Sequence, residues 1–366
     1  MSKLTYEFIK KLPKTDLHCH LDGSLRVSTI LDIAKEHDVE LPAYNEEDLK
    51  KHLVMDKVES LEEYLKAFSI TCSVLQTEDA LKRVAFELAE DAALENIRYL
   101  EVRYAPILHQ EKGLNLAAIV DAVLAGLVKA ERKYNIKTGV IICGIRNMNP
   151  DISVKLAELC VAYKNKGVLG FDLAGAEEDY PAKQHKEAFY LVLNNNVNVT
   201  IHAGEAYGPA SIAQAIHYCG AHRIGHGIRL KEDGDLLNYV NDHRIPLEIC
   251  LTSNIQTNSV KNFDMHPLRF FYDYGLRVTL NTDNRLISDT TMTDEFLLAH
   301  EKYNFSYEDL KKIIIDSCKS AFLSHHEKVT LLLSVLDELK KLDKIYMKEF
   351  GIEKLDSKRK KSKLSV

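Results

Sequence analysis

The chain of 366 residues is predicted to fold as an α/β protein of the (β/α)₈ barrel class. Eight short runs of apolar and β-branched residues recur along it, and such runs are typical of buried parallel strands. Segments with helical periodicity separate the runs, and this alternation indicates a parallel sheet covered by helices. An open doubly wound sheet is the alternative fold, but neither a Gly-x-Gly-x-x-Gly motif nor a Walker loop follows the first run.

The predicted strands are short and strongly apolar. The second reads Ile-Arg-Tyr-Leu-Glu-Val-Arg and the third reads Thr-Gly-Val-Ile-Ile-Cys, both with the β-branched residues that strands favour. We predict strands at 14–19, 97–103, 138–143, 167–172, 197–202, 222–226, 245–250 and 277–282.

Helical patterns lie between these strands. Pro209 suits the first turn of a helix, where its missing N–H costs no hydrogen bond. Asp151 follows Pro150 and is predicted to cap another helix. The predicted helices cover 78–95, 115–134, 151–166, 209–219 and 232–242.

Two segments exceed what a minimal barrel needs. About 77 residues separate the first two strands, with helical patterns at 24–38 and 60–75, so we expect a helical cap inserted near the barrel mouth. The segment 306–349 predicts two extra helices after the eighth strand. We therefore expect a single domain over 1–350, followed by a disordered basic tail at 351–366.

Composition and charge limit the possible partners. The net charge is −6, and the tail at 351–366 carries a local +4, which leaves about −10 on the rest of the chain. Such a body repels a phosphate backbone, so nucleic-acid binding is not expected. Seven cysteines without a Cys-x-x-Cys pair fit neither a disulfide framework nor a zinc ribbon. With no apolar leader and no run long enough to span a membrane, we expect a cytoplasmic protein without membrane association.

Polar motifs end five of the predicted strands. Because the carboxyl ends of barrel strands meet at one mouth, these motifs are expected to form a single catalytic site. They are Asp16-Leu17-His18-Cys19-His20, Asp172-Leu173-Ala174-Gly175, His202-Ala203-Gly204-Glu205, Gly225-His226-Gly227 and Asn281-Thr282-Asp283-Asn284.

Four residues of these motifs are candidate metal ligands. His18 and His20 are two apart in a strand, so their side chains share one face. His202 and Asp283 end the fifth and eighth strands. Imidazole and carboxylate ligands suit Zn²⁺, and a further position left for water is typical of a catalytic rather than a structural zinc.

Other motif residues are candidates for the chemistry itself. Glu205 lies three residues beyond His202, where it can stand beside the metal as a general acid, or alternatively cap a helix. His226, between two glycines, suits a base or an electrostatic helper for the attacking water. Asp22 is expected over the mouth, where it can accept from a substrate hydroxyl, and Gly175 leaves space at the end of the fourth strand.

Four further polar or reactive positions are interpreted as structural. Glu101 and Arg103 share a face of the second strand and are expected to pair with each other inside the barrel. Cys143 and Cys250 are expected to act as small buried hydrophobic residues rather than as nucleophiles.

Taken together, the motifs resemble those of adenosine deaminases, in the adenosine/AMP deaminase group of metal-dependent barrel hydrolases. They occur in the family's order between residues 17 and 284, with the cap insertion in the expected place. The resemblance rests on Leu17-His18-Cys19-His20-Leu21-Asp22-Gly23-Ser24, Asp172-Leu173-Ala174-Gly175, Ile201-His202-Ala203-Gly204-Glu205, Arg223-Ile224-Gly225-His226-Gly227 and Asn281-Thr282-Asp283.

The resemblance implies hydrolytic deamination at purine C6. It implies that Glu205 protonates N1, that His226 supports the attacking water and that Asp283 takes part in accepting its proton. Ammonia leaves and inosine remains. One Zn²⁺ per chain would activate the water, held by His18, His20, His202 and Asp283.

The resemblance also implies how the substrate is held. Asp22 would meet the ribose 5′ hydroxyl, which favours adenosine and 2′-deoxyadenosine over adenine or AMP. Asn284 departs from the family, which has a second Asp there to meet purine N7. An Asn amide donates to N7 without needing an extra proton, so purine binding should survive. The implied substrate contacts are His20, Asp22, Gly175 and Asn284.

Two alternatives remain at the sequence level. One is a barrel aminohydrolase that acts on adenine or another aminopurine compound. The other is a catalytically silent barrel that only binds a ligand, which predicts at least one lost ligand or acid, whereas all are present here. Protein partners are unknown from the sequence.

Overall fold

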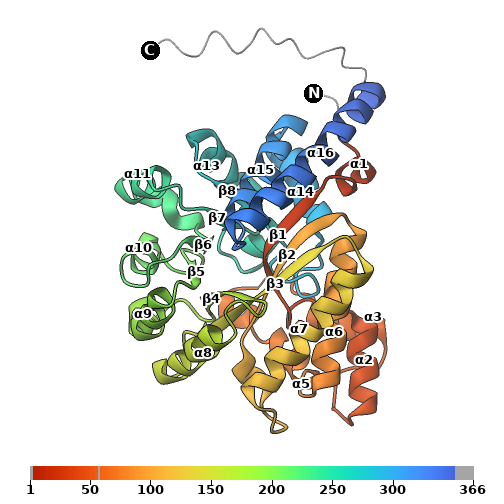
Figure 1. The fold of residues 1–366 in the computed structure, drawn as a ribbon, viewed down its shortest axis with the longest axis vertical. Helices are drawn as coiled ribbons and strands as arrows, with labels where there is room; N and C mark the ends of the chain where they lie inside the picture. Colours follow the sequence, from red (N-terminus) through yellow and green to blue (C-terminus); the bar gives the residue numbers. More distant parts are fainter. Residues whose placement is uncertain (1–2, 57, 351–366) are drawn as a thin grey trace.

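The computed structural model describes residues 3–56 and 58–350, and eight parallel strands in this part of the chain form a barrel (Figure 1). Each strand pairs with the next one along the chain, so the barrel prediction is confirmed and the open-sheet alternative is wrong. Every predicted strand is present to within two residues at either end. The strands are β1 (Lys14–His20), β2 (Ile97–Tyr104), β3 (Lys137–Ile145), β4 (Val168–Ala174), β5 (Asn198–Ala203), β6 (Arg223–His226), β7 (Leu247–Ile249) and β8 (Val278–Leu280).

The barrel closes between its first and last strands through an irregular contact just beyond β8. The N–H of Asp283 donates to the carbonyl of His18 at 2.8 Å, and the N–H of His20 donates to the carbonyl of Asp283 at 2.7 Å. One step earlier, the side-chain oxygen of Asn281 accepts from the N–H of Leu17 at 3.0 Å. The seam therefore places Asp283 between the two histidines of β1.

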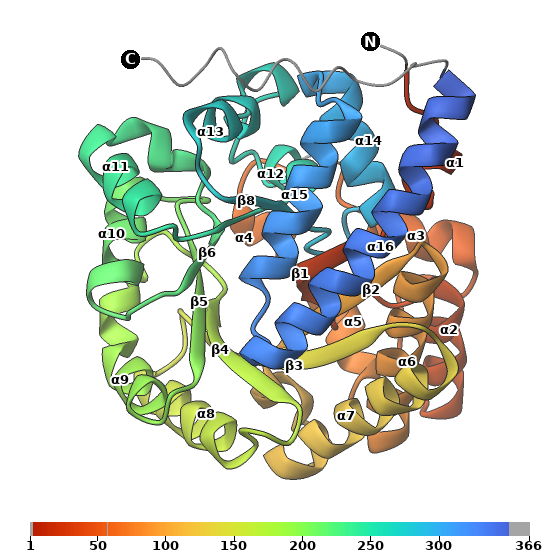
Figure 2. The same ribbon diagram turned by 45° about the horizontal axis from the view of Figure 1, so that its top comes forward.

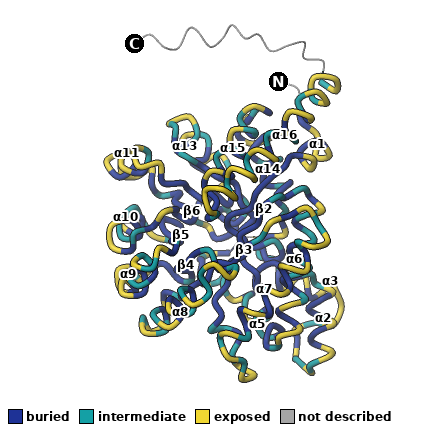
Figure 3. The backbone as a smooth tube through the Cα atoms, in the orientation of Figure 1, coloured by how far each residue is buried: buried dark blue, intermediate teal, exposed yellow. Residues whose placement is uncertain are grey.

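Helices surround the strands, and the backbone is most deeply buried along the strands at the centre (Figure 3). This is the layering that a parallel barrel requires, because both faces of each strand are covered. The helices outside the cap and the C-terminal extension are α1 (Tyr6–Lys10), α6 (Glu78–Leu94), α7 (Leu116–Lys133), α8 (Pro150–Ala162), α9 (Lys186–Asn194), α10 (Pro209–His217), α11 (Gly234–Asp242), α12 (Leu251–Gln256), α13 (Leu268–Tyr274) and α14 (Met292–Tyr303).

The N-terminal ends of α10 and α8 test two predictions, one of which is confirmed and one of which is wrong. Pro209 is the first residue of α10, as predicted. The predicted cap at Asp151 is wrong, because Asn149 is the N-cap of α8 and its side chain accepts from the N–H of Asp151 at 2.9 Å. Pro150 takes the first helical position, so the cap lies two residues before Asp151.

The long insertion after β1 forms the predicted helical cap, visible in red and orange in Figure 1. It contains α2 (Val27–Glu36), α3 (Glu46–Leu53), α4 (Leu61–Tyr64) and α5 (Ala67–Val74). The single helical pattern predicted at 60–75 is thus divided between α4 and α5. Two backbone bonds tie the insertion to the mouth, from the N–H of Met55 to the carbonyl of Ile287 and from Val58 to Gln256, both 3.0 Å.

The two predicted C-terminal helices are α15 (Tyr307–Ser320) and α16 (His325–Phe350). Figure 2 shows α16 lying across the strands at the end opposite the cap. Between these helices, the N–H of Phe322 donates to Glu101 at 2.6 Å, and the guanidinium of Arg223 stacks 3.5 Å from the Phe322 ring. Phe322 therefore packs against two residues of the barrel interior, Glu101 and Arg223.

None of the described helices is both long enough and apolar enough to cross a membrane. The predicted basic tail at 351–366 lies outside the described residues.

Candidate active site

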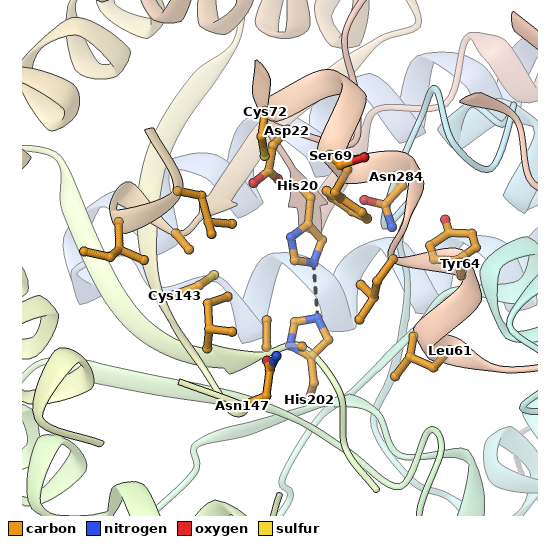
Figure 4. A pocket seen from close by; sticks show the side chains of 18 of the residues that line it. His20, Asp22, Leu61, Tyr64, Ser69, Cys72, Cys143, Asn147, His202 and Asn284 are labelled. Carbon is orange, nitrogen blue, oxygen red and sulfur yellow. Dashed lines mark hydrogen bonds between the residues drawn. The ribbon is translucent and has the colours of Figure 1, made fainter. Parts of the chain in front are cut away.

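The four candidate metal ligands meet at the mouth of the barrel. One ligand atom from each lies within 4.8 Å of the others, and all four side chains are buried. Figure 4 shows His20 and His202 facing each other, with their Nε2 atoms 3.1 Å apart. One carboxylate oxygen of Asp283 lies 3.3 Å from Nε2 of His18 and 3.4 Å from Nε2 of His20.

Residues behind the ligands determine which ring nitrogens face the centre. The Nδ1–H of His18 donates to Glu248 at 2.9 Å, and the Nδ1–H of His202 donates to Asp172 at 3.2 Å. Both rings therefore present the lone pair of Nε2 to the centre. Ser253 donates to the second oxygen of Asp283 at 2.6 Å. Such partners orient metal ligands in known metal sites.

This donor set fits a divalent metal ion. Nε2 of His18 has no hydrogen-bonding partner, although the acceptor oxygen of Asp283 lies close to it. Burial lowers the pKa of His20 and of His202, so both rings are neutral at pH 7 and can offer a lone pair. Three imidazoles and one carboxylate converging in a buried place are typical of a catalytic zinc site.

Two of the site residues have an unusual backbone conformation. His226 has φ 60° and Asp283 has φ 59°, both in the left-handed region that non-glycine residues rarely adopt. Each lies where the chain leaves the end of a barrel strand, and the turn directs its side chain into the mouth. Such local strain is concentrated at functional sites.

A network of ion pairs inside the barrel holds Asp172 and Glu248, the hydrogen-bonding partners of two candidate ligands. Arg103 contacts Asp172 at 3.2 Å and Glu248 at 2.9 Å, while Arg223 contacts Glu248 and Glu101. Burial disfavours the Glu248 carboxylate, but both arginines outweigh this and hold its pKa well below the ordinary value. Glu101 and Arg103 lie inside the barrel as expected, but the predicted pair between them is wrong, because each has another partner.

Glu205 is placed to hold a proton. Its side chain is buried, and its carboxylate lies 3.4 Å from Nε2 of His226. Burial raises its pKa well above the ordinary value, and the charges of Asp283 and Glu177 raise it further. Glu205 precedes the N-cap of α10, Gly208, by three residues, so it does not cap that helix.

The backbone around Glu205 is held by one carboxylate. Glu177 accepts the N–H groups of four consecutive residues, Gly204 (2.6 Å), Glu205 (3.0 Å), Ala206 (2.6 Å) and Tyr207 (3.0 Å). This loop therefore has little freedom, and the direction of the Glu205 side chain is set by Glu177. Glu177 was not among the predicted site residues, although it follows the polar motif at the end of the fourth strand by only two residues.

A cavity of about 550 Å³ opens beside the metal-ligand cluster. Strand ends line one side and helices α4 and α5 of the cap line the other, with Leu61, Tyr64 and Phe68 among the apolar residues. In Figure 4, Asp22 and Cys72 lie at one end of the cavity, and Asn284 lies beside Tyr64. The cavity suits a ligand with an apolar ring and a few polar groups.

The candidate substrate contacts all line this cavity. Asp22 is buried, one of its oxygens has no partner, and burial raises its pKa to about 7. The side-chain oxygen of Asn284 also has no partner. A Cβ at Gly23 would lie 1.9 Å from that oxygen, so only glycine fits there. Gly175 has φ 93°, which L side chains rarely adopt, and it leaves this part of the wall open.

The cavity wall lacks a positive charge. Within the described part of the chain, the acidic residues of the wall are Asp22, Glu111, Glu205 and Asp283, and neither lysine nor arginine lines it. Cys143, expected to be a simple buried residue, also lines the wall, and its thiol contacts Asp172 at 3.5 Å.

Comparison with known sequences gives consistent matches. Residues 13–338 match the sequence model of a family described as adenosine deaminase. The chain is 43% identical over 323 residues to an adenosine deaminase of Clostridium botulinum, covering 88% of this chain and 98% of that protein. It is 43% identical over 330 residues to a "probable adenosine deaminase" of Dictyostelium discoideum, covering 90% of this chain but 43% of that longer protein.

Solved structures show the same barrel. The adenine deaminase of Arthrobacter aurescens is 26% identical with a TM-score of 0.84, covering 90% of this chain and 99% of that one. The N6-methyl-AMP deaminase of Arabidopsis thaliana is 27% identical with a TM-score of 0.81, covering 91% of this chain and 98% of that one. An Arabidopsis relative solved with IMP is 26% identical with a TM-score of 0.82, covering 92% and 99%.

Proposed function

This chain belongs to the adenosine deaminase family, and we propose that it hydrolyses adenosine and 2′-deoxyadenosine to inosine and 2′-deoxyinosine with release of ammonia. The observation that carries the proposal is the position of Glu205. A buried carboxyl group with a raised pKa lies beside His226 and next to the metal-ligand cluster, in the wall of a cavity large enough for a nucleoside.

We propose that the chain binds one Zn²⁺. His18, His20, His202 and Asp283 would hold it. When bound, the ion supplies a Lewis acid that lowers the pKa of a water molecule and makes it a nucleophile at neutral pH.

The protein side chains then have distinct tasks at the purine. Glu205 holds a proton at its carboxyl group and delivers it to N1, so that negative charge does not build up on the ring as C6 becomes tetrahedral. His226 lies next to Glu205 and orients the attacking water. Asp283 accepts the proton that the water loses, and that proton passes to the amino group. The C6–N bond then breaks and ammonia leaves. The proton of the new C6 hydroxyl is lost as the carbonyl of inosine forms, which balances the proton that Glu205 gave to N1.

The charge of the wall supports a nucleoside rather than a nucleotide as the substrate. Asp22 can accept a hydrogen bond from the ribose 5′ hydroxyl, whereas a 5′ phosphate there would meet carboxylates and no cation. The Arabidopsis relatives solved with IMP and named for N6-methyl-AMP act on or bind nucleotides, so this wall is a point at which the chains are expected to differ.

Asn284 is proposed to hold purine N7. Its amide N–H₂ is a permanent donor and N7 is an acceptor, so the contact needs no protonated carboxyl group. Tyr64 lies next to Asn284 and also bonds the hydroxyl of Ser288 at 2.7 Å, which limits the rotation of this part of the wall. Gly175 and His20 complete the proposed substrate contacts.

We place this reaction in purine salvage in the cytoplasm. All seven cysteines lie in the described part of the chain, and all are free thiols, six of them buried. Free thiols without disulfides are typical of a reducing compartment.

A substrate panel tests the proposal. Adenosine, 2′-deoxyadenosine, adenine and AMP would be compared by ultraviolet absorbance, with the metal content of the same protein measured by elemental analysis. We expect the two nucleosides to be the preferred substrates and zinc to be present. A preference for adenine would instead support the activity named for the Arthrobacter structure, and a preference for AMP would contradict the role given to Asp22.

A further inference from the structure

A chain of buried polar groups lies behind His226, on the side away from the cavity. It consists of Asn254 in α12, His266 just before α13, and the backbone N–H of Leu268, the first residue of α13. Asn254 and His266 are 0% and 5% exposed, and neither lines the cavity. They therefore act on His226 and not on the substrate.

The direction of the hydrogen bond between Leu268 and His266 is unambiguous, because a backbone N–H can only donate. The N–H of Leu268 lies in the first turn of a helix, where it has no partner within the helix. It donates to Nδ1 of His266 at 3.1 Å, so this nitrogen carries a lone pair and not a proton. Burial lowers the pKa of His266 to about 3, which is consistent with a neutral ring. The single ring proton of His266 is then on Nε2.

That proton orients the amide of Asn254. Nε2 of His266 lies 3.1 Å from Oδ1 of Asn254 and donates to it. The reversed amide would place its N–H₂ group against another N–H, so two donors would face each other. Although the two ends of an amide look alike, the fixed donor at Leu268 decides between them here.

The amide in turn decides which nitrogen of His226 is protonated. Nδ2 of Asn254 lies 3.0 Å from Nδ1 of His226, and an amide nitrogen only donates. Nδ1 of His226 is therefore an acceptor. With Nδ1 as an acceptor, the ring proton is on Nε2, which faces the carboxyl group of Glu205 at 3.4 Å.

We propose that Asn254 and His266 are positioning residues that hold His226 as the Nε2–H tautomer, so that His226 donates a hydrogen bond to the attacking water and does not remove its proton. The part concerning the reaction rests on the proposed function, whereas the tautomer does not. Of the two roles open to His226, base and electrostatic helper, this arrangement selects the second. Asp283 is left as the acceptor of the water's proton.

Nuclear magnetic resonance of protein labelled with ¹⁵N-histidine tests the tautomer without any substrate. His226 is identified as the signal missing from the His226→Gln protein. We expect a protonated Nε2 and an unprotonated Nδ1 in the wild-type protein as purified. A protonated Nδ1 there would overturn the proposal.

The Asn254→Asp variant reverses the polarity at a single contact. Asp keeps the side-chain shape and still accepts from His266, but it presents an acceptor oxygen to His226. We expect His226 to carry a proton on Nδ1 in this variant. Asn258→Asp, an exposed position on the same segment, is the matched control and should leave the His226 signal unchanged. An unchanged tautomer in Asn254→Asp would overturn the proposal.

Kinetics separate positioning from a merely structural role. We expect kcat of Asn254→Asp to fall about 100-fold, as for loss of one preorganised donor, while KM for adenosine and zinc content stay near wild type. His266→Gln keeps a donor for Asn254 and should retain most of kcat and the tautomer, whereas His266→Leu should lose both. Loss of zinc or stability in step with kcat would indicate a structural role and contradict the proposal.

The two proposals fail in different ways. A wild-type protein that shows the Nε2–H tautomer but does not deaminate adenosine would leave the positioning by Asn254 intact and refute the proposed function. A protein that deaminates adenosine with His226 protonated on Nδ1 would support the proposed function and refute the positioning by Asn254.

Discussion

At the scale of single residues, two buried glutamates of the barrel differ in whether they hold a proton. Glu205 has a raised pKa, while Glu248 has a lowered one, although both are buried carboxylates within the same barrel. The difference lies in their neighbours. Glu248 contacts Arg103 and Arg223, whereas Glu205 faces the charges of Asp283 and Glu177.

Replacing Glu205 by Gln tests its role as the acid. The amide keeps the shape and can still donate to N1, but it cannot transfer a proton, so we expect kcat to fall by several orders of magnitude. Zinc content and melting temperature should stay near wild type. Kinetics measured with elemental analysis would check this, and near-normal turnover would mean that another group is the acid.

Replacing Asp22 by Ala tests substrate choice. Only a nucleoside has a hydroxyl for Asp22 to hold, so kcat/KM should fall roughly 10- to 150-fold for adenosine, equivalent to about 1.5–3 kcal/mol for a hydrogen bond to a charged group. The loss for free adenine should be much smaller. Steady-state kinetics with both substrates decide the question, because equal losses would assign Asp22 to support of the metal site instead.

At the scale of elements, the ends of several strands supply parts of the site, and the elements around the barrel limit how these parts move. The cap helices α4 and α5 form the apolar wall, and the short 3₁₀ helix η1 (Pro106–His109) after β2 packs beside them. The side chain of Gln76, just after α5, donates to the carbonyl of Leu108 at 2.9 Å. Cap and barrel are thus held together next to His109.

Because His109 is buried, we expect the stability of the fold to decrease at acidic pH. Burial lowers its pKa from 6.5 to about 4, so between these values the unfolded chain binds a proton that the folded chain does not. Stability therefore rises with pH across this window and is lost as the pH falls, by up to about 3 kcal/mol from this group.

The His109→Leu variant removes that contribution. Its free energy of unfolding, measured by urea denaturation from pH 4.5 to 7, should depend less on pH than that of the wild type. His326→Leu, at an exposed position of α16, serves as the control. Parallel curves for wild type and His109→Leu would show that His109 takes up its proton without cost in the folded state.

At the scale of the whole molecule, the four candidate metal ligands join distant parts of the chain. They come from β1, from β5 and from the turn after β8, where the contact between Asp283 and β1 closes the barrel. A metal ion bound there would link the beginning, the middle and the end of the fold. Stability and metal binding should therefore be coupled.

Removal of the metal should destabilise the fold. An ion that binds only the folded state adds about 3 to 4 kcal/mol at 100 to 1,000 times its dissociation constant. We expect a chelator to lower the melting temperature and abolish deamination, and zinc to restore both, as measured by calorimetry. His202→Ala should lack activity and respond little to the chelator. Identical melting curves with and without chelator would contradict the coupling.

The amino-acid pattern alone was enough to predict the strands and the residues that end them. Runs with strand periodicity, separated by helical patterns, specify eight strands, and His18, His20, His202 and Asp283 follow from their places at the strand ends. These are local properties, because the backbone period of a strand decides which neighbours share a face.

The hydrogen-bonding partners of these residues could not be predicted, because they depend on how distant segments fold together. His18 bonds Glu248, 230 residues away, and Leu17 bonds Asn281, 264 residues away, because register and barrel closure bring them together. A buried Glu in a predicted strand signals that a partner is needed, but it does not say which one. The same holds for Asn254 and His266, whose role depends on the direction of hydrogen bonds that exist only once α12 and the start of α13 lie beside His226.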